Sequence, residues 1–338
     1  MFCEHCGNPI PEGARFCPSC GAAAPVSAAP QQPLWQPEAA PAQPVQPARP
    51  ARIPWHSRGL LSPERKPGVR RGVNVLFVAA LVILQIVLLL VFSNFEGLEP
   101  DPLIAQAVGL LPTLVLIVYI FCLDSIEKEP PGLLLLLFLV EGAVCCTLVL
   151  AAEVVLNMVF TSFMDESTVF FRLIDAVFLV ALVEELGKYL VLKLLTWKNK
   201  AFNYRFDGVV YAAVTALGFA AFENVQYISA YGLATALQRS VTAVPGHCVD
   251  GILMGLFYGQ AKVYEARGDL ARSKRFRRLA VLAPVLEHGF YDFVAGTESE
   301  LVATLFFGYI LLLNATVFVL VWRQSQKDEA VALPEQLG

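Results

Sequence analysis

The stretch VNVLFVAALVILQIVLLLVFS, residues 73–93, decides the class of fold, because it contains no charged side chain. A helix needs about 20 mostly apolar residues to cross the hydrocarbon core of a bilayer, so the stretch predicts a transmembrane helix. The whole chain agrees with this prediction, since 56% of its 338 residues are hydrophobic and 16% are charged. A soluble protein carries about 25% charged residues, and an ordinary soluble enzyme is therefore excluded.

Further apolar segments follow the first one, and together they predict an all-α polytopic membrane protein with about eight transmembrane helices. Lys and Arg gather before the first segment and after the fourth, sixth and eighth, whereas the alternate loops are acidic or nearly neutral. Cytoplasmic loops are enriched in Lys and Arg, so we expect a multi-pass membrane protein with both termini in the cytoplasm. The expected spans are residues 73–93, 103–123, 133–157, 176–195, 208–231, 240–263, 278–296 and 301–322.

Residues 1–24 contain the pattern C-x2-C-x10-C-x2-C, formed by Cys3, Cys6, Cys17 and Cys20. Two such cysteine pairs make a closed site with four sulfur ligands, which is the geometry of structural zinc, and the stretch resembles short bacterial zinc ribbons. A pair of disulfides is the alternative, but disulfides suit an oxidising compartment rather than the expected cytoplasmic side. The module is too small to bury a core, so we expect zinc binding to drive its folding.

Residues 25–72 are predicted to form a disordered linker. Eleven of the 22 prolines lie between Pro25 and Pro67, interleaved with Ala and Gln. This composition favours extended segments that bury no core. We therefore divide the chain into a zinc ribbon (1–24), the linker (25–72), a multi-pass membrane domain (73–323) and a cytoplasmic tail (324–338).

Ionisable side chains recur within four of the expected spans, where each one costs on the order of 2.5 to 3.5 kcal/mol on insertion scales. Counting inward from the outer end of each span places one acid or imidazole per helix roughly 11 to 12 Å below the outer boundary. These four residues are Glu184, Glu223, His247 and His288. Buried groups of this kind mark functional sites in membrane proteins. Their polar neighbours in the same spans are Glu185, Lys188, Asn224, Asp250, Glu287 and Asp292.

Helical spacing pairs several of these side chains. Glu184 and Lys188 are four residues apart, as are His288 and Asp292, so each pair shares one helix face. Lys188 would neutralise part of the glutamate charge, and Asp292 would orient the imidazole of His288. Glu184 and Glu185 project about 100° apart, so one is expected to face the site while the other pairs elsewhere.

Taken in chain order, these motifs resemble the PrsW family of bacterial intramembrane proteases, which is distantly similar to the CAAX protease and bacteriocin-processing superfamily. The resemblance covers roughly residues 105–320 and does not include the zinc ribbon. It implies hydrolysis of peptide bonds within the membrane. The matching motifs are E-E-x-x-K at Glu184 to Lys188, F-x-x-x-E at Phe219 to Glu223 followed by Asn224, a histidine at His247, and H-x-x-x-D at His288 to Asp292.

Two chemistries are compatible with this resemblance. In the favoured one, Glu223, His247 and His288 bind a catalytic divalent metal, expected to be zinc. Glu184 or Glu185 is then the general base toward a bound water. In the other, one of these two glutamates activates water without a metal. The candidates that would then stabilise the oxyanion are His247, His288, Asn224 and Asp292.

The resemblance also implies a single-pass membrane protein, such as an anti-sigma factor, as substrate. Three roles are open for the zinc ribbon, which are binding of a protein partner, binding of nucleic acid and regulation of access, and its few basic residues argue against a strong nucleic-acid footprint. Two rival functions are a membrane scaffold in which the polar network locks helix packing, and an ion or solute transporter.

Four further charged residues are expected at the ends of spans or in outer loops, away from the chemistry: Glu153, Arg172, Asp175 and Arg239.

Overall fold

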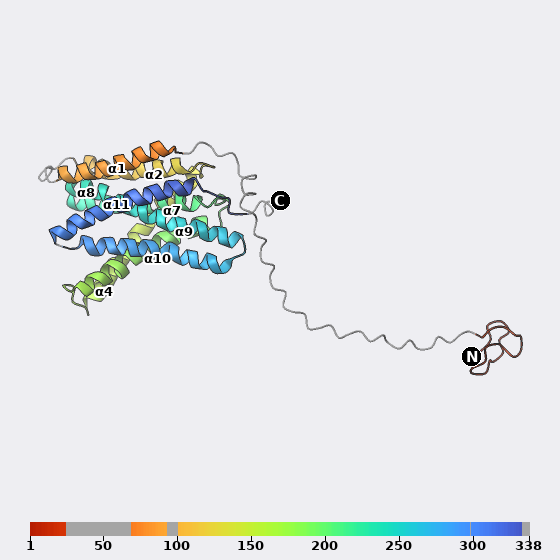
Figure 1. Cartoon of the computed structure of the whole chain (residues 1–338). Helices are drawn as coiled ribbons and strands as arrows, with labels where there is room; N and C mark the ends of the chain where they lie inside the picture. Colours follow the sequence, from red (N-terminus) through yellow and green to blue (C-terminus); the bar gives the residue numbers. More distant parts are fainter. Residues whose placement is uncertain (25–68, 93–100, 298, 333–338) are drawn as a thin grey trace. The chain divides into compact units, whose positions relative to one another are not determined.

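The computed structural model describes residues 1–24, 69–92, 101–297 and 299–332. The chain divides into two compact units, which are the N-terminal cysteine module and a bundle of helices (Figure 1). The predicted linker lies outside the described residues up to residue 68, and so does the end of the predicted tail from residue 333.

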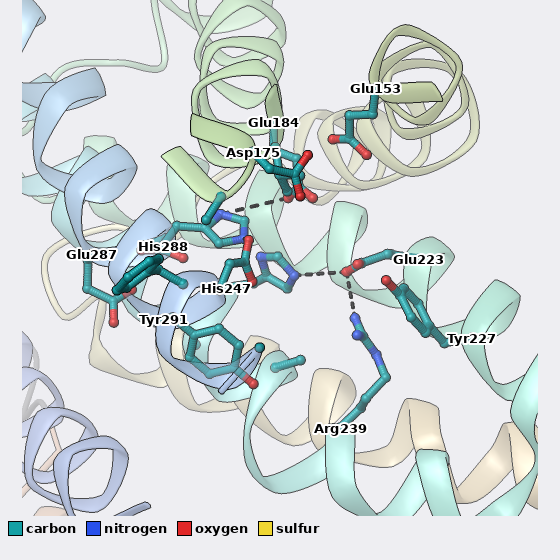
Figure 2. Close-up of a pocket in the computed structure, with 18 of the residues that line it drawn as sticks. Glu153, Asp175, Glu184, Glu223, Tyr227, Arg239, His247, Glu287, His288 and Tyr291 are labelled. Carbon is teal, nitrogen blue, oxygen red and sulfur yellow. Dashed lines mark hydrogen bonds and ion pairs between the residues drawn. The ribbon is translucent and has the colours of Figure 1, made fainter. Parts of the chain in front are cut away.

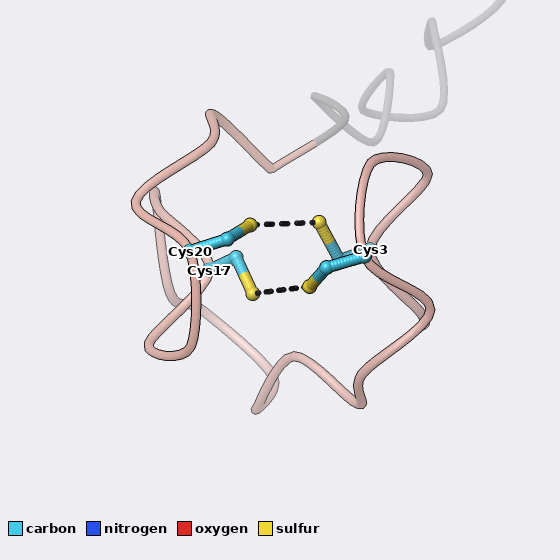
Figure 3. A group of neighbouring side chains, drawn as sticks. Cys3, Cys17 and Cys20 are labelled. Carbon is cyan, nitrogen blue, oxygen red and sulfur yellow. Dashed lines mark hydrogen bonds between the residues drawn. The ribbon is translucent and has the colours of Figure 1, made fainter.

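The N-terminal module is built from two similar cysteine turns. The Sγ atoms of Cys3 and Cys20 lie 3.6 Å apart, those of Cys6 and Cys17 lie 3.7 Å apart, and all four thiols are free (Figure 3). The alternative to zinc binding, a pair of disulfides, is therefore not formed. Each turn continues into a glycine with positive φ, one of which is Gly7 at 73°. The four sulfurs lie within 4.8 Å of one another, as a zinc site requires.

The bundle consists of helices that run roughly parallel or antiparallel to one another (Figure 1). Two long helices contain a π-helical segment, which is a feature found often at functional sites. In chain order the elements are α1 (Arg71–Phe92), α2 (Pro102–Leu123), α3 (Pro131–Leu139), the π-helical η2 (Val140–Cys146), α4 (Thr147–Thr161), α5 (Val169–Ile174), the π-helical η3 (Asp175–Ala181), α6 (Leu182–Thr196), α7 (Asp207–Tyr231), α8 (Leu233–Val241), α9 (Ala243–Ala266), α10 (Leu270–Ala295) and α11 (Glu300–Ser325).

Each expected span coincides with a helix or a continuous series of helical elements, and this confirms the all-α membrane fold. Among the residues that the structure describes, five helical segments are long and apolar enough to cross a membrane by themselves. Three expected spans are outside this group. The first contributes a shorter apolar helix, Arg71–Val87, and the fourth and seventh carry the charged side chains of α6 and the basic start of α10. The number of eight spans stays a prediction. The five segments are Pro102–Leu123, Pro131–Thr161, Asp207–Tyr231, Leu233–Ala266 and Glu300–Ser325.

The core of the bundle lies where α7 packs against α9. Every side chain of α7 from Asp207 to Ala221 is buried. Small residues on α9 allow the two backbones to approach closely, since a Cβ on Gly255 would lie 2.5 Å from the Cα of Val209. This contact holds Glu223 on α7 beside His247 on α9.

Candidate active site

A cavity of about 330 Å³ lies between α4, α5, η3, α6, α7, α8, α9 and α10. In Figure 2, side chains from several of these elements point into one shared space. The predicted one-plane group of Glu184, Glu223, His247 and His288 is brought together here, and each of these side chains lines the cavity. The other ionisable side chains of the lining are Glu153, Arg172, Asp175, Tyr227, Arg239, Asp250, Glu287, Tyr291 and Asp292.

The acidic end of the site comes from α6, just after the π-helical segment η3. Lys188 Nζ donates to Glu184 Oε2 at 2.9 Å and to Glu185 Oε1 at 2.6 Å, and these side chains are at most 4% exposed. Glu184 lines the cavity, whereas Glu185 and Lys188 do not. The two glutamates therefore differ in their access to the cavity.

His288 on α10 lies between carboxylates from two helices. Its Nδ1 atom is 3.0 Å from Glu185 Oε1 and 3.8 Å from Glu184 Oε2. Its Nε2 atom is 3.3 Å from Asp292 Oδ2, one helical turn further along α10. Partners on both ring nitrogens hold the imidazole in one orientation.

His247 on α9 is paired with Glu223 on α7, with Nε2 and Oε2 2.9 Å apart. The same carboxylate oxygen accepts a hydrogen bond from Arg239 Nη2 at 2.7 Å. Arg239 also donates from Nε to Asn224 Oδ1 at 2.8 Å, and its guanidinium lies over the ring of Tyr227, 4.0 Å from the centroid. Glu223 is therefore neutralised by an arginine from α8 (Figure 2).

Lys188 joins the two halves of the site. Its Nζ atom lies 3.3 Å from His247 Nδ1, while it holds both glutamates of α6. The rings of His247 and His288 are 5.3 Å apart and nearly perpendicular, at 86°. The carboxylates and imidazoles thus form one connected polar network.

Four residues of this network could hold a metal ion. One donor atom from each of Glu184, Glu185, His247 and His288 lies within 4.8 Å of the others. Two carboxylates and two imidazoles are a suitable donor set for zinc, and Glu185 Oε2 is a buried oxygen without a partner. Glu223 is outside this group of four, although the sequence analysis predicts it as a ligand.

Several lining residues are missing from the predicted site. Glu153, Asp175 and Arg239 are expected from sequence to lie at span ends or in an outer loop, but all three line the cavity. The π-helical η3 carries Asp175, and Asn157 donates to it at 3.2 Å. For Arg239 the available signal is the amphipathic pattern of α8, which indicates a helix packed against the bundle rather than a loop. By contrast, the predicted Asn224 bonds to Gly109 on α2 and is not part of the lining.

Buried carboxylates and imidazoles around a cavity, inside a bundle of apolar helices, are typical of the functional site of a membrane protein, and this set contains the groups that an intramembrane hydrolase needs. The sequence model described as "PrsW family intramembrane metalloprotease" matches residues 129–322, and a zinc-ribbon domain matches residues 2–23. The chain therefore belongs to the PrsW family of intramembrane metalloproteases. This confirms the predicted class of enzyme and the predicted zinc ribbon, and it places the protein in a membrane.

Curated relatives support this assignment. Protease PrsW of Oceanobacillus iheyensis is 34% identical over 188 residues, which are 55% of this chain and 80% of the relative. Protease PrsW of Clostridioides difficile is 33% identical over 210 residues, 61% of this chain and 84% of the relative. Protease PrsW of Shouchella clausii is 30% identical over 214 residues, 63% and 90% of the two chains. No solved structure matches the chain.

Proposed function

We propose that the chain hydrolyses peptide bonds of membrane-protein substrates in the cavity lined by Glu184, His247 and His288. The observation that carries the proposal is the group of four donor residues on α6, α9 and α10, whose donor atoms lie within 4.8 Å of one another. Peptide hydrolysis needs a base beside the attacking water and positive charge beside the developing oxyanion. The network contains groups for both roles.

Glu184 is the general base in this proposal. Its carboxylate lines the cavity, where water has access, whereas Glu185 is fully buried and absent from the lining. Glu185 instead acts as a positioning residue, because it accepts from Lys188 and lies 3.0 Å from His288 Nδ1. The positive charge of Lys188 offsets part of the free-energy cost of burying the two adjacent carboxylates.

The two histidines face the reacting groups in fixed orientations. His288 is held between Glu185 and Asp292, and His247 is held between Glu223 and Lys188. Because neighbours hold both rings in place, each imidazole needs to exchange only one of these contacts to bind or stabilise a reacting group. Asn224 keeps the guanidinium of Arg239 in place beside Glu223.

A divalent metal would be held by Glu185, His247 and His288, three of the four clustered donors, so that Glu184 stays free as the general base and one coordination position stays open. When bound, such a metal supplies a Lewis acid that polarises the scissile carbonyl and lowers the pKa of water. Glu223 then orients His247 rather than binding the metal, because it is outside the group of donors that lie within 4.8 Å of one another. The ligand set predicted from sequence, with Glu223 in place of Glu185, is the alternative, and so is metal-free water activation by Glu184 or Glu185.

A single-pass membrane protein, such as an anti-sigma-factor-like regulator, is the proposed substrate. The cavity is lined by Gly296, at the end of α10, and thus lies toward the end of the bundle opposite to the basic start of α10. Basic loops favour the cytoplasmic side, so the cavity would open in the outer half of a bacterial cell membrane, with both chain termini in the cytoplasm. The substrate helix would then be cut near its extracytoplasmic end.

A comparison of membrane proteomes tests this function. Cells would produce wild-type protein, Glu184→Gln or the control Glu166→Gln, whose side chain is exposed in the segment before α5. Loss of a general base lowers turnover by about 100-fold to 10,000-fold, so an uncut membrane protein should accumulate only with Glu184→Gln. If folded Glu184→Gln protein causes no precursor to accumulate, the proposal is wrong.

A further inference from the structure

A groove of about 520 Å³ runs between the C-terminal part of α6 and the N-terminal part of α10. Its lining contains four cationic side chains and no carboxylate. Within the described residues, none of the four cations takes part in an ion pair. The full lining is Tyr189, Lys193, Lys274, Arg277, Arg278, Val281 and Leu282.

Aromatic rings support two of these cations without neutralising them. The guanidinium of Arg277 lies over the ring of Trp197, 5.3 Å from its centroid, and Lys193 Nζ lies 5.9 Å from the centroid of Tyr189. Such contacts orient a cation but leave its net charge intact. The groove is therefore a concentrated positive site that lacks an anion of its own.

The groove lies at the opposite end of α6 and α10 from the candidate active site. The two helices run antiparallel, because His288 late in α10 meets Glu185 early in α6. The groove joins the other two ends, where Lys193 faces the start of α10. Lys and Arg are enriched where transmembrane helices leave the hydrocarbon core on the cytoplasmic side, so we expect this end of the bundle to meet the lipid headgroups.

Exposed leucines follow the cations on both helices in the direction of the membrane interior. On α10, Leu282 and Leu286 follow Arg278 at four-residue spacing and are 50% and 66% exposed. On α6, Leu186 is 42% exposed and lies two helical turns from Lys193, on the same face. Each helix thus presents a cation at the membrane surface and an apolar stripe below it.

We propose that this groove binds an anionic phospholipid, with the phosphate headgroup between Lys193 and Arg278 and the acyl chains along the leucine stripes of α6 and α10. Four unpaired cations complement an anionic headgroup, and basic pockets between transmembrane helices bind such headgroups. The apolar stripes distinguish a lipid from a free anion, because a soluble phosphate would gain nothing from them.

The bound lipid would bridge the two helices that build the candidate active site. α6 carries Glu185 and α10 carries His288, and the contact between these residues joins the helices at the other end. An anionic lipid would therefore favour the arrangement in which they meet. This consequence for activity rests on the proposed function, whereas lipid binding itself does not.

Thermal unfolding of the purified full-length protein in mild detergent tests the site. Dioleoyl phosphatidylglycerol and dioleoyl phosphatidylcholine, which share acyl chains, would be titrated separately, and inorganic phosphate would be titrated as a third arm. We expect stabilisation by phosphatidylglycerol only. Each basic residue contributes about fivefold in affinity, equivalent to about 1 kcal/mol, so the double variant Lys193→Gln/Arg278→Gln should bind about 25-fold more weakly.

A matched control removes the same charge from the same end of the bundle. Lys198 and Arg275 are exposed and do not line the groove, so Lys198→Gln/Arg275→Gln should keep the affinity of wild type. Arg278→Lys should also retain binding, because the positive charge remains. Equal stabilisation by both lipids, equal losses in both double variants, or full stabilisation by inorganic phosphate would each overturn the proposal.

Discussion

The guanidinium of Arg239 lies 2.7 Å from the carboxylate of Glu223, measured from Nη2 to Oε2, and both side chains are mostly buried. Arg239 belongs to the nine-residue helix α8, which packs against the bundle beside α9. The same Glu223 oxygen lies 2.9 Å from His247 Nε2. The guanidinium of Arg239 on α8 is therefore linked through Glu223 to a histidine of the candidate active site.

Arg239→Gln should destabilise the protein by about 3 to 5 kcal/mol, because it leaves the Glu223 carboxylate buried without its partner. Adding Glu223→Gln should restore much of this loss, since the unpaired charge is then removed as well. Thermal unfolding of the two single variants and the double variant measures this coupling. Strictly additive losses would show that the two side chains do not stabilise each other.

Metal analysis of the full-length protein distinguishes the proposed ligand sets. We expect one metal ion in the zinc ribbon and a second in the membrane domain. Cys20→Ser should remove the first alone, and His288→Gln should remove the second alone. Glu223→Gln should retain both ions, because Glu223 is outside the proposed ligand group, whereas the ligand set predicted from sequence requires the second ion to be lost.

Removal of the metal tests the chemistry itself. Protein stripped by a chelator should lose proteolytic activity and regain it when zinc is restored. Full activity of metal-free protein would instead favour water activation by Glu184 or Glu185 alone.

Gly255→Val should loosen the contact between α7 and α9. A Cβ at this position would lie 2.5 Å from the Cα of Val209 and 2.6 Å from the carbonyl oxygen of Gly208, so the backbones must separate. Overpacking of this kind costs about 1 to 3 kcal/mol. The matched control is Gly308→Val on α11, where a Cβ meets nothing within 4 Å and thermal stability should hardly change. Similar melting temperatures for the two variants would contradict this expectation.

Two acids in the loop between α2 and α3 predict a pH-dependent stability. Burial raises the pKa of Asp124 from 3.8 to about 7, and the charge of Glu129 acts in the same direction. Burial also raises the pKa of Glu129 to about 7, against the effect of its hydrogen bond from Tyr211. Between about pH 4 and 7 the folded protein therefore binds more protons than the unfolded chain, and stability falls as the pH rises.

Thermal unfolding between pH 5 and pH 8 measures this effect. The full-length wild type should become less stable over this range, and Asp124→Asn should show a shallower loss because one of the two titrating groups is gone. The control Glu166→Gln, with an exposed side chain, should follow the wild type. An Asp124→Asn variant with an unchanged pH slope would show that this acid does not titrate as expected.

The sequence predicted the features that depend on local pattern. Apolar runs identified the membrane helices, because the bilayer core demands a continuous apolar length. Cysteine spacing identified the zinc ribbon, since two short turns suffice to place four sulfurs. Counting along each helix placed Glu184, Glu223, His247 and His288 at one depth, and the cavity contains all four.

The tertiary structure decided how these residues are paired, because pairing depends on the rotation and contact of separate helices. Helix periodicity places Glu184 and Glu185 on different faces of α6. Only the packing of α6 against its neighbours decides that Glu184, and not Glu185, lines the cavity. Likewise, Arg239 is an isolated loop charge until α8 folds against α7 and brings it to Glu223. By itself the sequence determined which ionisable groups lie on apolar helices, whereas helix packing determined which of them meet, since residues far apart in the chain acquire fixed distances only in the packed bundle.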